Sequence, residues 1–515
     1  MKVLFLNIFP KGLTQYLFSS YLLINYLQKN EKIANKIEFE VINISTEKGN
    51  IIGLIENRTY DILCLSCYIW NKGILLNLVK NMNNNTKIIW GGPEISESFI
   101  KEVTGTQENV FIIGEGEKKL EFVLMHYLNA YFETKYTLNP VNWDNNLFYI
   151  DDTQNNNTCP FFQIYTTGLI PNKLIQYQIV LLETQRGCIF NCSYCNYNKT
   201  KSRIRYYELN DILAELEYLT QKKARAIRIV DAVFTSDLNR AKEIIRFLLK
   251  IRQTYNYIPA IFLETDIRCV DEDFLSLLDK MKNRQKVTHS LDNLNKSNVA
   301  QMYSNIINEY KCILSIGIQS MSEQALHACG RYMPTSDHIQ KFINYIRKYN
   351  LSLKIDMILG MPLETKESYY NGLEQLLPIF DGADHILNIH ILKVLPNTRL
   401  MNESEKYEII FENTNNNVIA TSTLDRNTLF EMKVLSAILF RVINSDLRKS
   451  FIHKMQIERN LYALLSTIKM RLDKMNQLPL ILSTYNESIN DEYWNTEIYQ
   501  DLPENVLESI FDSII

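Results

Sequence analysis

Three cysteines follow one another near the middle of the chain at the spacing C-x3-C-x2-C: Cys188, Cys192 and Cys195. They come directly after residues 178–182, an apolar run typical of a buried strand, so the thiols are expected on the loop leaving that strand. A structural zinc site would need four ligands, usually in two paired halves, and no second half follows at a suitable distance. Three thiolates can hold a [4Fe–4S] cluster and leave one iron open. The spacing therefore favours an iron–sulfur cluster over zinc.

This motif, with the aromatic Tyr194 directly before its last cysteine, resembles that of the radical S-adenosylmethionine (SAM) family. The resemblance implies that Cys188, Cys192 and Cys195 bind the cluster and that the open iron takes the amino and carboxylate groups of SAM. It also implies that Tyr194 lies against the adenine. Electron transfer would split SAM into methionine and a 5′-deoxyadenosyl radical, which calls for a reducing partner such as flavodoxin or ferredoxin.

Strand and helix patterns alternate after the cysteines, as in a parallel barrel or partial barrel. Strands are expected at residues 226–231, 260–264, 313–318, 353–359 and 385–392. The family typically has a partial barrel of six such units. The same resemblance therefore implies that residues 179–400 form a radical SAM partial (β/α)6 barrel.

Several residues at the ends of these strands match family positions that contact SAM. Asp231 stands where the second strand usually contacts the amino group, Glu264 resembles a ribose-binding acid, and Arg331 matches a basic residue near the carboxylate. The remaining matches are Gln319, Ser320 and Asp356, the last of which opens a D-x-I-x-G-x-P pattern. Taken singly, Asp231 and Asp356 have an alternative interpretation as helix caps. His390 and Lys393 end a strand where substrate could lie, or serve the structure alone.

Residues 1–130 alternate strands and helices in the pattern of a doubly wound parallel sheet, with strands expected at 3–7, 39–42, 61–66, 87–90 and 110–113. Ligands bind such sheets beyond the C-terminal ends of the strands. The loops there resemble those of Rossmann-like (flavodoxin-like) cobalamin-binding domains attached to radical SAM enzymes. This resemblance implies cobalamin contacts from Phe9, Ser66, Tyr68, Trp70, Gly91, Gly92, Gly114, Glu115 and Gly116.

The loop after the first strand departs from one cobalamin-binding pattern. Domains that bind cobalamin through a histidine carry D-x-H-x-x-G there, and Phe9 occupies the histidine position. We therefore expect no imidazole ligand from this loop, and Tyr68 and Trp70 are candidates to line the lower face of the cofactor. The alternative is an α/β domain that only packs against the barrel or holds substrate.

The order of these segments predicts an α/β protein in four parts. They are a cobalamin-binding-like domain at 1–130, a polar linker at 131–178, the barrel at 179–400 and a mainly helical substrate or cap domain at 401–515. In the last part, residues 430–442 and 455–475 have a helical period. Residues 283–308 are unusually polar for the barrel and are expected to be a surface insertion.

Composition argues against several functional classes. The 515 residues are 46% hydrophobic and 22% charged, with a net charge of −3, so no general attraction to nucleic acid or to an anionic membrane is expected. The chain has no run of eighteen apolar residues, so no membrane span is predicted. Nine cysteines in a chain of this length do not make a disulfide scaffold, and with the cluster motif they indicate a reducing cytoplasm.

The resemblance implies a cobalamin-dependent radical SAM enzyme that methylates an unactivated carbon of a peptide or natural product. A 5′-deoxyadenosyl radical and methylcobalamin would carry out that reaction. One alternative is a radical SAM epimerase, cyclase or rearrangement enzyme that transfers no methyl group. A second is a non-catalytic iron–sulfur or cobalamin carrier, which would have no need of Glu264 or Gln319.

Overall fold

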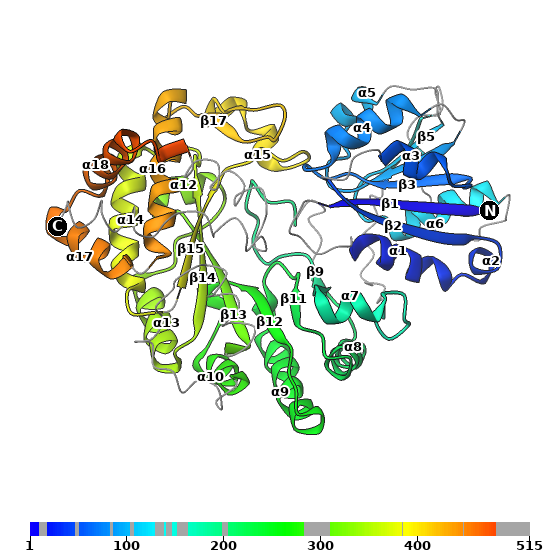
Figure 1. Cartoon of the computed structure of the whole chain (residues 1–515), viewed down its shortest axis with the longest axis horizontal. Coiled ribbons are helices and arrows are strands. Elements are labelled where there is room, and N and C mark those ends of the chain that lie inside the picture. The colour runs from blue at the N-terminus through cyan, green and yellow to red at the C-terminus, as the bar shows by residue number, and fades with distance from the viewer. Residues whose placement is uncertain are drawn as a thin grey trace.

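The computed structural model describes residues 1–9, 18–46, 51–82, 86–103, 108–128, 139–140, 147–151, 163–197, 204–282, 310–383, 385–445 and 447–479. Two parallel sheets dominate this part of the chain, and each is covered by helices (Figure 1). The cysteine motif lies on the loop after the first strand of the second sheet, and we call residues 183–197 the cysteine loop. The predicted insertion 283–308 and the loop beyond Phe9 lie outside the described residues.

The first sheet has the strand order β2-β1-β3-β4-β5-β7-β6. Its parallel strands are β1 (Lys2–Phe9), β2 (Glu38–Ser45), β3 (Ile62–Ser66), β4 (Lys87–Gly91) and β5 (Asn109–Ile112). These strands are nearly continuous apolar runs because helices cover both faces of the sheet. One face packs on α1 (Phe18–Gln28), α2 (Glu31–Ala34) and α6 (Glu117–Tyr127). The other packs on α3 (Ile51–Glu56), α4 (Lys72–Asn81) and α5 (Glu97–Glu102), so the predicted doubly wound fold is confirmed.

Two further strands lie within the segment that the sequence predicted as a linker. β7 (Leu147–Asp151) pairs in parallel with β5, and β6 (Asn139–Pro140) pairs antiparallel with β7. The segment therefore also extends the first sheet. The sequence did not predict β7 as a strand because polar residues and prolines surround its short apolar run. Helix α7 (Asn172–Tyr177) follows and leads directly into the second sheet.

The second sheet is parallel throughout, in the order β15-β14-β13-β12-β11-β8. Its strands are β8 (Ile179–Leu182), β11 (Ala226–Ile229), β12 (Ala260–Thr265), β13 (Cys312–Gln319), β14 (Ser352–Leu359) and β15 (His385–Ile391). The intervening helices are α8 (Leu209–Gln221), α9 (Leu238–Tyr255), α10 (Glu272–Met281), α12 (Glu323–Ala328), α13 (Ser336–Tyr349) and α14 (Lys366–Phe380). Six β/α units in this order are the predicted partial barrel.

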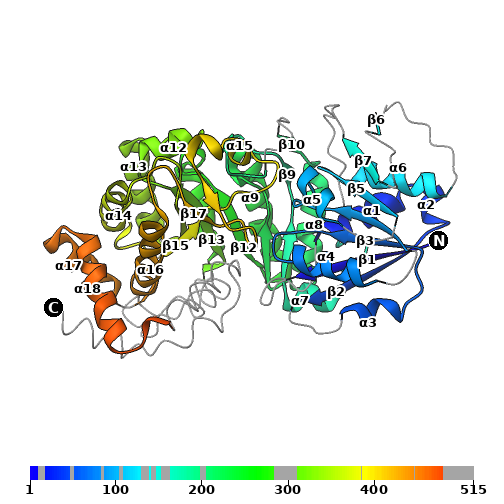
Figure 2. The same cartoon turned by 90° about the horizontal axis from the view of Figure 1, so that it is seen from above.

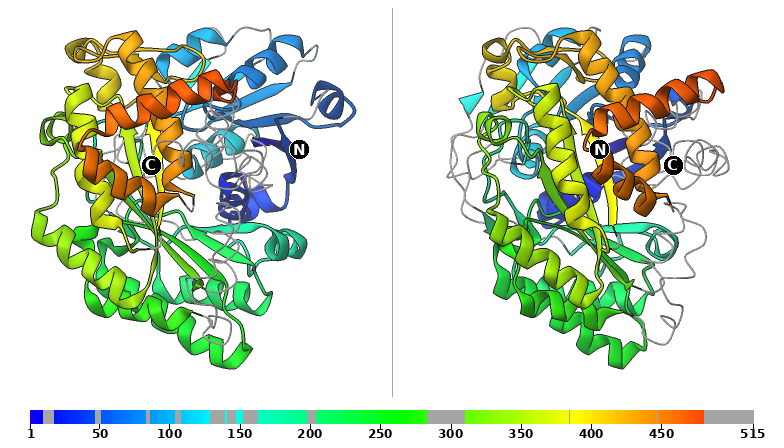
Figure 3. Two further views of the ribbon diagram at one scale, coloured as in Figure 1. Left: turned by 60° about the vertical axis from the view of Figure 1, so that its left-hand side comes forward. Right: turned by 90° about the vertical axis from the view of Figure 1, so that its left-hand side faces the viewer.

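The edge strand β15 is covered by the C-terminal helices. Helix α16 (Arg426–Ile443) packs on β15, and Asn444 at its end pairs with both the N–H and the carbonyl of Leu387 at 2.9 Å. Such a side chain satisfies backbone groups that an open edge would leave for another strand. The short hairpin of β16 (Ile410–Phe411) and β17 (Val418–Ala420) precedes α16. Figure 3 shows α16 and the helices after it, in orange and red, against this end of the barrel.

The expected single helix over 455–475 is wrong. The structure has two helices, α17 (Arg448–Glu458) and α18 (Leu461–Lys474), because Arg459 adopts a left-handed conformation with φ of 50°. The Asn460 side chain then accepts a hydrogen bond from the Ala463 N–H and caps the second helix. Figure 2 shows α17 and α18 at the end of the molecule opposite the first sheet. No helix in the described ranges is long and apolar enough to cross a membrane.

Candidate functional site

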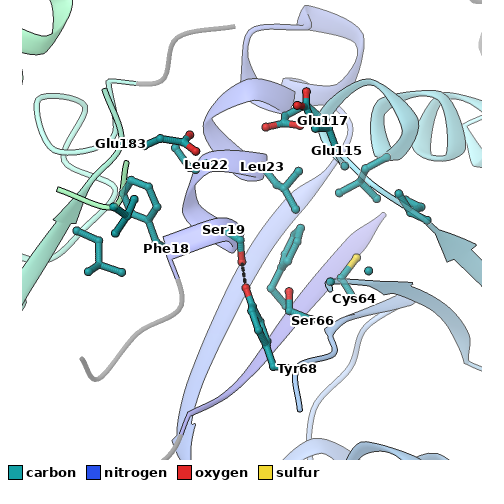
Figure 4. Close-up of a pocket in the computed structure, with 18 of the residues that line it drawn as sticks. Phe18, Ser19, Leu22, Leu23, Cys64, Ser66, Tyr68, Glu115, Glu117 and Glu183 are labelled. Carbon is teal, nitrogen blue, oxygen red and sulfur yellow. Dashed lines mark hydrogen bonds between the residues drawn. The ribbon is translucent and has the colours of Figure 1, made fainter. Parts of the chain in front are cut away.

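A cavity of about 570 Å³ lies where the C-terminal ends of the two sheets face each other. One wall comes from the ends of β1, β3, β4 and β5 with helix α1, and the other from the ends of β8, β11 and β12. Figure 4 shows lining side chains from both walls, among them Tyr68 and Glu115 from the first sheet and Glu183 from the second. All nine residues predicted to contact cobalamin, from Phe9 to Gly116 along the chain, line this cavity, and Glu264 joins them from the barrel.

Two aromatic rings form a flat part of the first wall. Tyr68 and Trp70 stack with centroids 4.4 Å apart and an interplanar angle of 9°. The Tyr68 hydroxyl lies 3.3 Å from Ser19 Oγ, and Trp70 Nε1 donates to the carbonyl of Ile8 at 3.1 Å (Figure 4). Burial raises the pKa of Tyr68, so its hydroxyl stays neutral. The pair therefore offers a rigid, uncharged surface.

Asp231 organises the start of the cysteine loop. Its carboxylate is 1% exposed and accepts from the Thr184 N–H at 2.7 Å, from Thr184 Oγ1 at 2.5 Å and from the Gln185 N–H at 3.3 Å. Burial raises the pKa of Asp231 to about 7 against the opposing effect of these bonds. The interpretation of Asp231 as a helix cap is wrong, because Asp237 caps α9. The predicted contact with SAM stays a prediction, since these three partners belong to the loop.

A guanidinium lies beside the three thiols. Arg331 Nη1 is 3.8 Å from Cys192 Sγ, and the Phe190 N–H donates to Cys188 Sγ at 3.4 Å. Burial raises the pKa of Cys195 to about 11, so its thiol is neutral at pH 7 until a metal displaces the proton. Within the described ranges no three His, Cys, Asp or Glu side chains gather round one point that could hold a single ion. In a cluster each thiolate would bind a different iron, and the assignment of these cysteines as cluster ligands stays a prediction.

Residues 182–311, which include the cysteine loop, match the family model of the radical SAM superfamily. This part of the chain is a radical SAM domain. Among curated proteins, the chain is 25% identical over 425 residues to the cobalamin-dependent radical SAM methyltransferase TokK of Streptomyces tokunonensis, covering 77% of this chain and 56% of TokK. The chain spans about half the length of the curated relatives it matches.

Two solved structures share the fold. The cobalamin-dependent SAM radical enzyme OxsB with aqua-cobalamin bound has a TM-score of 0.58 at 15% identity, covering 99% of this chain and 83% of that one. The radical SAM methyltransferase TsrM from Kitasatospora setae, with cobalamin and a [4Fe–4S] cluster bound, has a TM-score of 0.52 at 15% identity, covering 79% and 78%. The predicted arrangement of an α/β domain, a partial barrel and a helical C-terminal part is therefore confirmed.

The interior of the radical SAM barrel is apolar at the bottom and polar above. Ala226, Ala260, Phe262, Ile313 and Ile386 pack together at the N-terminal ends of its strands. Toward the C-terminal ends, Arg228 Nη2 lies 3.4 Å from Glu264 Oε1, and both line the cavity. Glu264 and Arg228 therefore lie where a molecule bound in the cavity can contact them.

Asp356 lies in this polar layer with its carboxylate engaged by neighbouring strands. It accepts from Lys354 and from His390 Nε2 at 3.0 Å each, and from Ser315 Oγ at 3.1 Å and Asn388 at 3.2 Å. Burial opposes ionisation, but the Lys354 ammonium and the His390 ring outweigh it and hold the pKa of Asp356 below its usual value. The interpretation of Asp356 as a helix cap is wrong, because Thr365 caps α14.

The other predicted SAM contacts lie along the end of β13 and behind the cysteine loop. Gln319 has φ of 71° at a bulge, and its side chain folds into the space that Gly317 leaves by having no Cβ. Ser320 is buried and donates to Glu364, while Tyr194 packs against the barrel core. These positions are as expected along the chain, and their contacts with SAM stay predictions.

The sequence did not predict the charged residues whose ion pairs stabilise the region around the cysteine loop. Asp266 is 3% exposed and binds Arg331 Nη2 at 3.0 Å and Arg268 Nε at 2.7 Å. Burial alone would raise the pKa of Asp266, but bonds from Arg268 and Arg331 outweigh it and lower that pKa. The signal was its place two residues after Glu264, past the end of β12. Also missed were the cavity residues Glu117, Glu183, Arg186, Tyr197 and Arg228.

The buried carboxyl group of Glu364 is expected to make the stability of the radical SAM domain depend on pH. Its Oε1 accepts from Ser320, no hydrogen-bond partner of Oε2 is found among the described residues, and burial raises its pKa from 4.5 to about 8. Between pH 4.5 and about 8, Glu364 therefore keeps a proton in the native protein that it has lost in the unfolded chain. The free energy of unfolding falls as pH rises through this range. Glu364→Gln is expected to exceed the wild type in free energy of unfolding at pH 9, by up to about 5 kcal/mol, and to match it near pH 4.

Urea unfolding at both pH values measures this difference. Glu367→Gln, at an exposed position in the first turn of α14, is the control and should follow the wild type at both. An equal difference between Glu364→Gln and the wild type at pH 4 and pH 9 would contradict the linkage.

Proposed function

We propose that the protein is a cobalamin-dependent radical SAM enzyme that methylates a carbon atom of a small natural product or peptide. The observation that carries this proposal is the shared cavity. The loops that resemble a cobalamin-binding wall and the end of the barrel strand that carries Glu264 line one space. A methyl donor held in one wall would therefore face a radical source held in the other.

The chain's own residues divide the task. Cys188, Cys192 and Cys195 would hold the cluster, with Arg331 beside Cys192 to balance its negative charge. Glu264, Gln319 and Arg331 would bind SAM, and the Tyr68–Trp70 surface would lie against one face of the corrinoid. Bound there, the cluster and SAM supply a radical and the corrinoid supplies a transferable methyl group. Among the described residues that line the cavity there is no histidine, so the wall would position the corrinoid without an imidazole ligand.

The names of related proteins support this assignment. TokK is named a cobalamin-dependent radical SAM methyltransferase, and a TsrM structure contains a tryptophan substrate with a SAM analogue. The name of TokK favours methyl transfer, and the tryptophan bound by TsrM favours a small molecule as substrate of this chain. A one-electron donor such as flavodoxin or ferredoxin completes the proposal, because reductive cleavage of SAM consumes an electron.

Anaerobic reconstitution tests the proposal. We expect the protein, loaded with iron and sulfide and then with hydroxocobalamin, to retain about four irons and one cobalamin per chain after desalting. Ser66→Phe, which fills the cavity from the end of β3, should lose the cobalamin and keep the iron. Four irons without cobalamin in the wild type would leave a radical enzyme that transfers no methyl group, and absence of iron would contradict the whole assignment.

A further inference from the structure

Two arginines stand directly opposite each other in a two-stranded ribbon at the edge of the cavity. The ribbon pairs β9 (Gln185–Arg186) with β10 (Arg205–Tyr206) in antiparallel register, and Arg186 is the partner of Arg205. Like charges at opposed positions destabilise a strand pair. Because β9 lies within the cysteine loop, two residues before Cys188, the ribbon that sets the course of this loop carries a built-in repulsion.

Carboxylates from the other domain compensate this repulsion. Arg186 Nη2 lies 2.6 Å from Glu117 Oε1 and Arg186 Nη1 lies 3.5 Å from Glu115 Oε2. Arg205 Nη1 donates to Glu115 at 3.1 Å. Glu183, on the cysteine loop itself, accepts a hydrogen bond from Arg186 Nε at 3.0 Å. The positive charge of the ribbon is therefore neutralised chiefly by Glu115 in the loop after β5 and by Glu117 at the start of α6.

These ion pairs are partly withdrawn from solvent. The side chains of Arg186 and Arg205 are 13% and 11% exposed and that of Glu117 is 8% exposed, whereas that of Glu115 is 41% exposed. Burial alone would raise the pKa of Glu115, but Arg205 and Arg186 hold that pKa below its usual value. The Arg186–Glu117 pair is therefore screened less by salt than a surface pair, and removing one partner leaves the other charge uncompensated.

The same side chains face the cavity. Glu115, Glu117, Glu183 and Arg186 all line it, and Figure 4 shows Glu183 across the cavity from Glu115 and Glu117. Gly114 and Gly116, predicted to contact the corrinoid, flank Glu115 in the chain. A molecule that fills the cavity therefore packs against the loop whose carboxylates hold Arg186 in place.

We infer that Arg186 is a positioning residue that couples the two cofactor sites, so that cobalamin in the cavity and the cluster on the cysteine loop bind cooperatively. This inference rests on the proposed function. A ligand that orders residues 114–117 reduces the cost of ordering the ribbon, and an assembled cluster orders the same ribbon from its other side. Coupling of this kind is reciprocal, so each cofactor raises the affinity of the protein for the other by the same factor.

The coupling is measured as a ratio of two affinities. Equilibrium dialysis of hydroxocobalamin under anaerobic conditions gives its Kd for the full chain with and without the cluster. We expect cobalamin to bind about tenfold more tightly to the cluster-loaded wild type, and this ratio to fall to about one in Arg186→Gln. Iron release to a chelator, a readout without turnover, should be slowed by cobalamin in the wild type only. Arg186→Lys should restore part of the ratio because it keeps one charge.

Lys242→Gln is the matched control. Lys242 on α9 is 10% exposed and pairs with Asp271 at 2.6 Å and Asp273 at 3.1 Å, away from the cavity, so its loss should leave the ratio unchanged. If Arg186→Gln does not fold, Glu117→Gln removes the same ion pair from the other domain and should also lower the ratio. A wild-type ratio retained in these variants overturns the inference alone, whereas a wild type that binds no cobalamin overturns the proposed function together with it.

Discussion

Replacing Cys192 by alanine is expected to remove the iron from the reconstituted protein and to reduce SAM cleavage to background. Three thiolates already leave one iron of a cluster open, and with two remaining ligands the cluster would not be retained. Cobalamin should still bind, because Cys188, Cys192 and Cys195 do not line the cavity, but about tenfold more weakly, as in the wild type without its cluster. Iron and sulfide analysis, the visible spectrum and the yield of 5′-deoxyadenosine measure these effects.

Cys269→Ala is the control for this substitution. Cys269 is half-buried like the three motif cysteines and lies near Cys188 at the end of β12, but it stands outside the C-x3-C-x2-C spacing. Burial raises the pKa of its thiol to about 11, as at Cys195. We expect the Cys269→Ala protein to keep four irons. Loss of iron in Cys269→Ala, or its retention in Cys192→Ala, would show that the motif has been assigned wrongly.

The features that could be predicted from sequence are those set over short stretches of chain. Apolar runs such as 62–65 and 110–112 fix buried parallel strands whatever surrounds them, and the spacing of three cysteines on one loop can be recognised without any tertiary contact. The cavity-wall residues could be predicted for a related reason. Parallel strands bring their C-terminal ends to the same edge, so loops separated in sequence converge without any knowledge of their contacts.

What could not be predicted depends on partners distant in the chain. Nothing near Arg186 in sequence shows that Glu117 will face it, since that pair forms only when the two sheets meet. The carboxylate of Asp356 could equally have met a ligand or the side chains of Ser315 and His390 on neighbouring strands, and only the register of β14 against β13 and β15 decides that. The break after α17 was missed because only Arg459 and Asn460 separate α17 from α18, and neither is a proline or glycine that would mark a helix end.

Gly92→Ala is expected to destabilise the first domain by about 3 kcal/mol or more and to abolish cobalamin retention. Gly92 has φ of 107°, and a Cβ there would lie 2.4 Å from the carbonyl oxygen and 2.8 Å from the nitrogen of Cys67. Both contacts are with backbone groups, because the Cys67 N–H donates to the Gly91 carbonyl and the Cys67 carbonyl accepts from the Glu94 N–H, so neither can be relieved by a side-chain rotation. The loops after β3 and β4 would have to separate, which moves Tyr68 and Trp70 out of the cavity wall.

Gly91→Ala tests whether the contact of a Cβ at Gly92 with Cys67 causes these effects, or whether any substitution in the glycine pair would cause them. Gly91 also lines the cavity, but it has no positive φ, and a Cβ there would meet nothing within 4 Å. Removing a glycine from a strand end at which alanine fits costs the folded state little and restricts the unfolded chain, so stability should be unchanged or slightly higher. Thermal unfolding and cobalamin retention of the two variants, measured side by side, are therefore expected to diverge. If both lose cobalamin while both stay folded, the close approach to Cys67 is not what shapes the wall, and side-chain volume at this edge of the cavity controls binding instead.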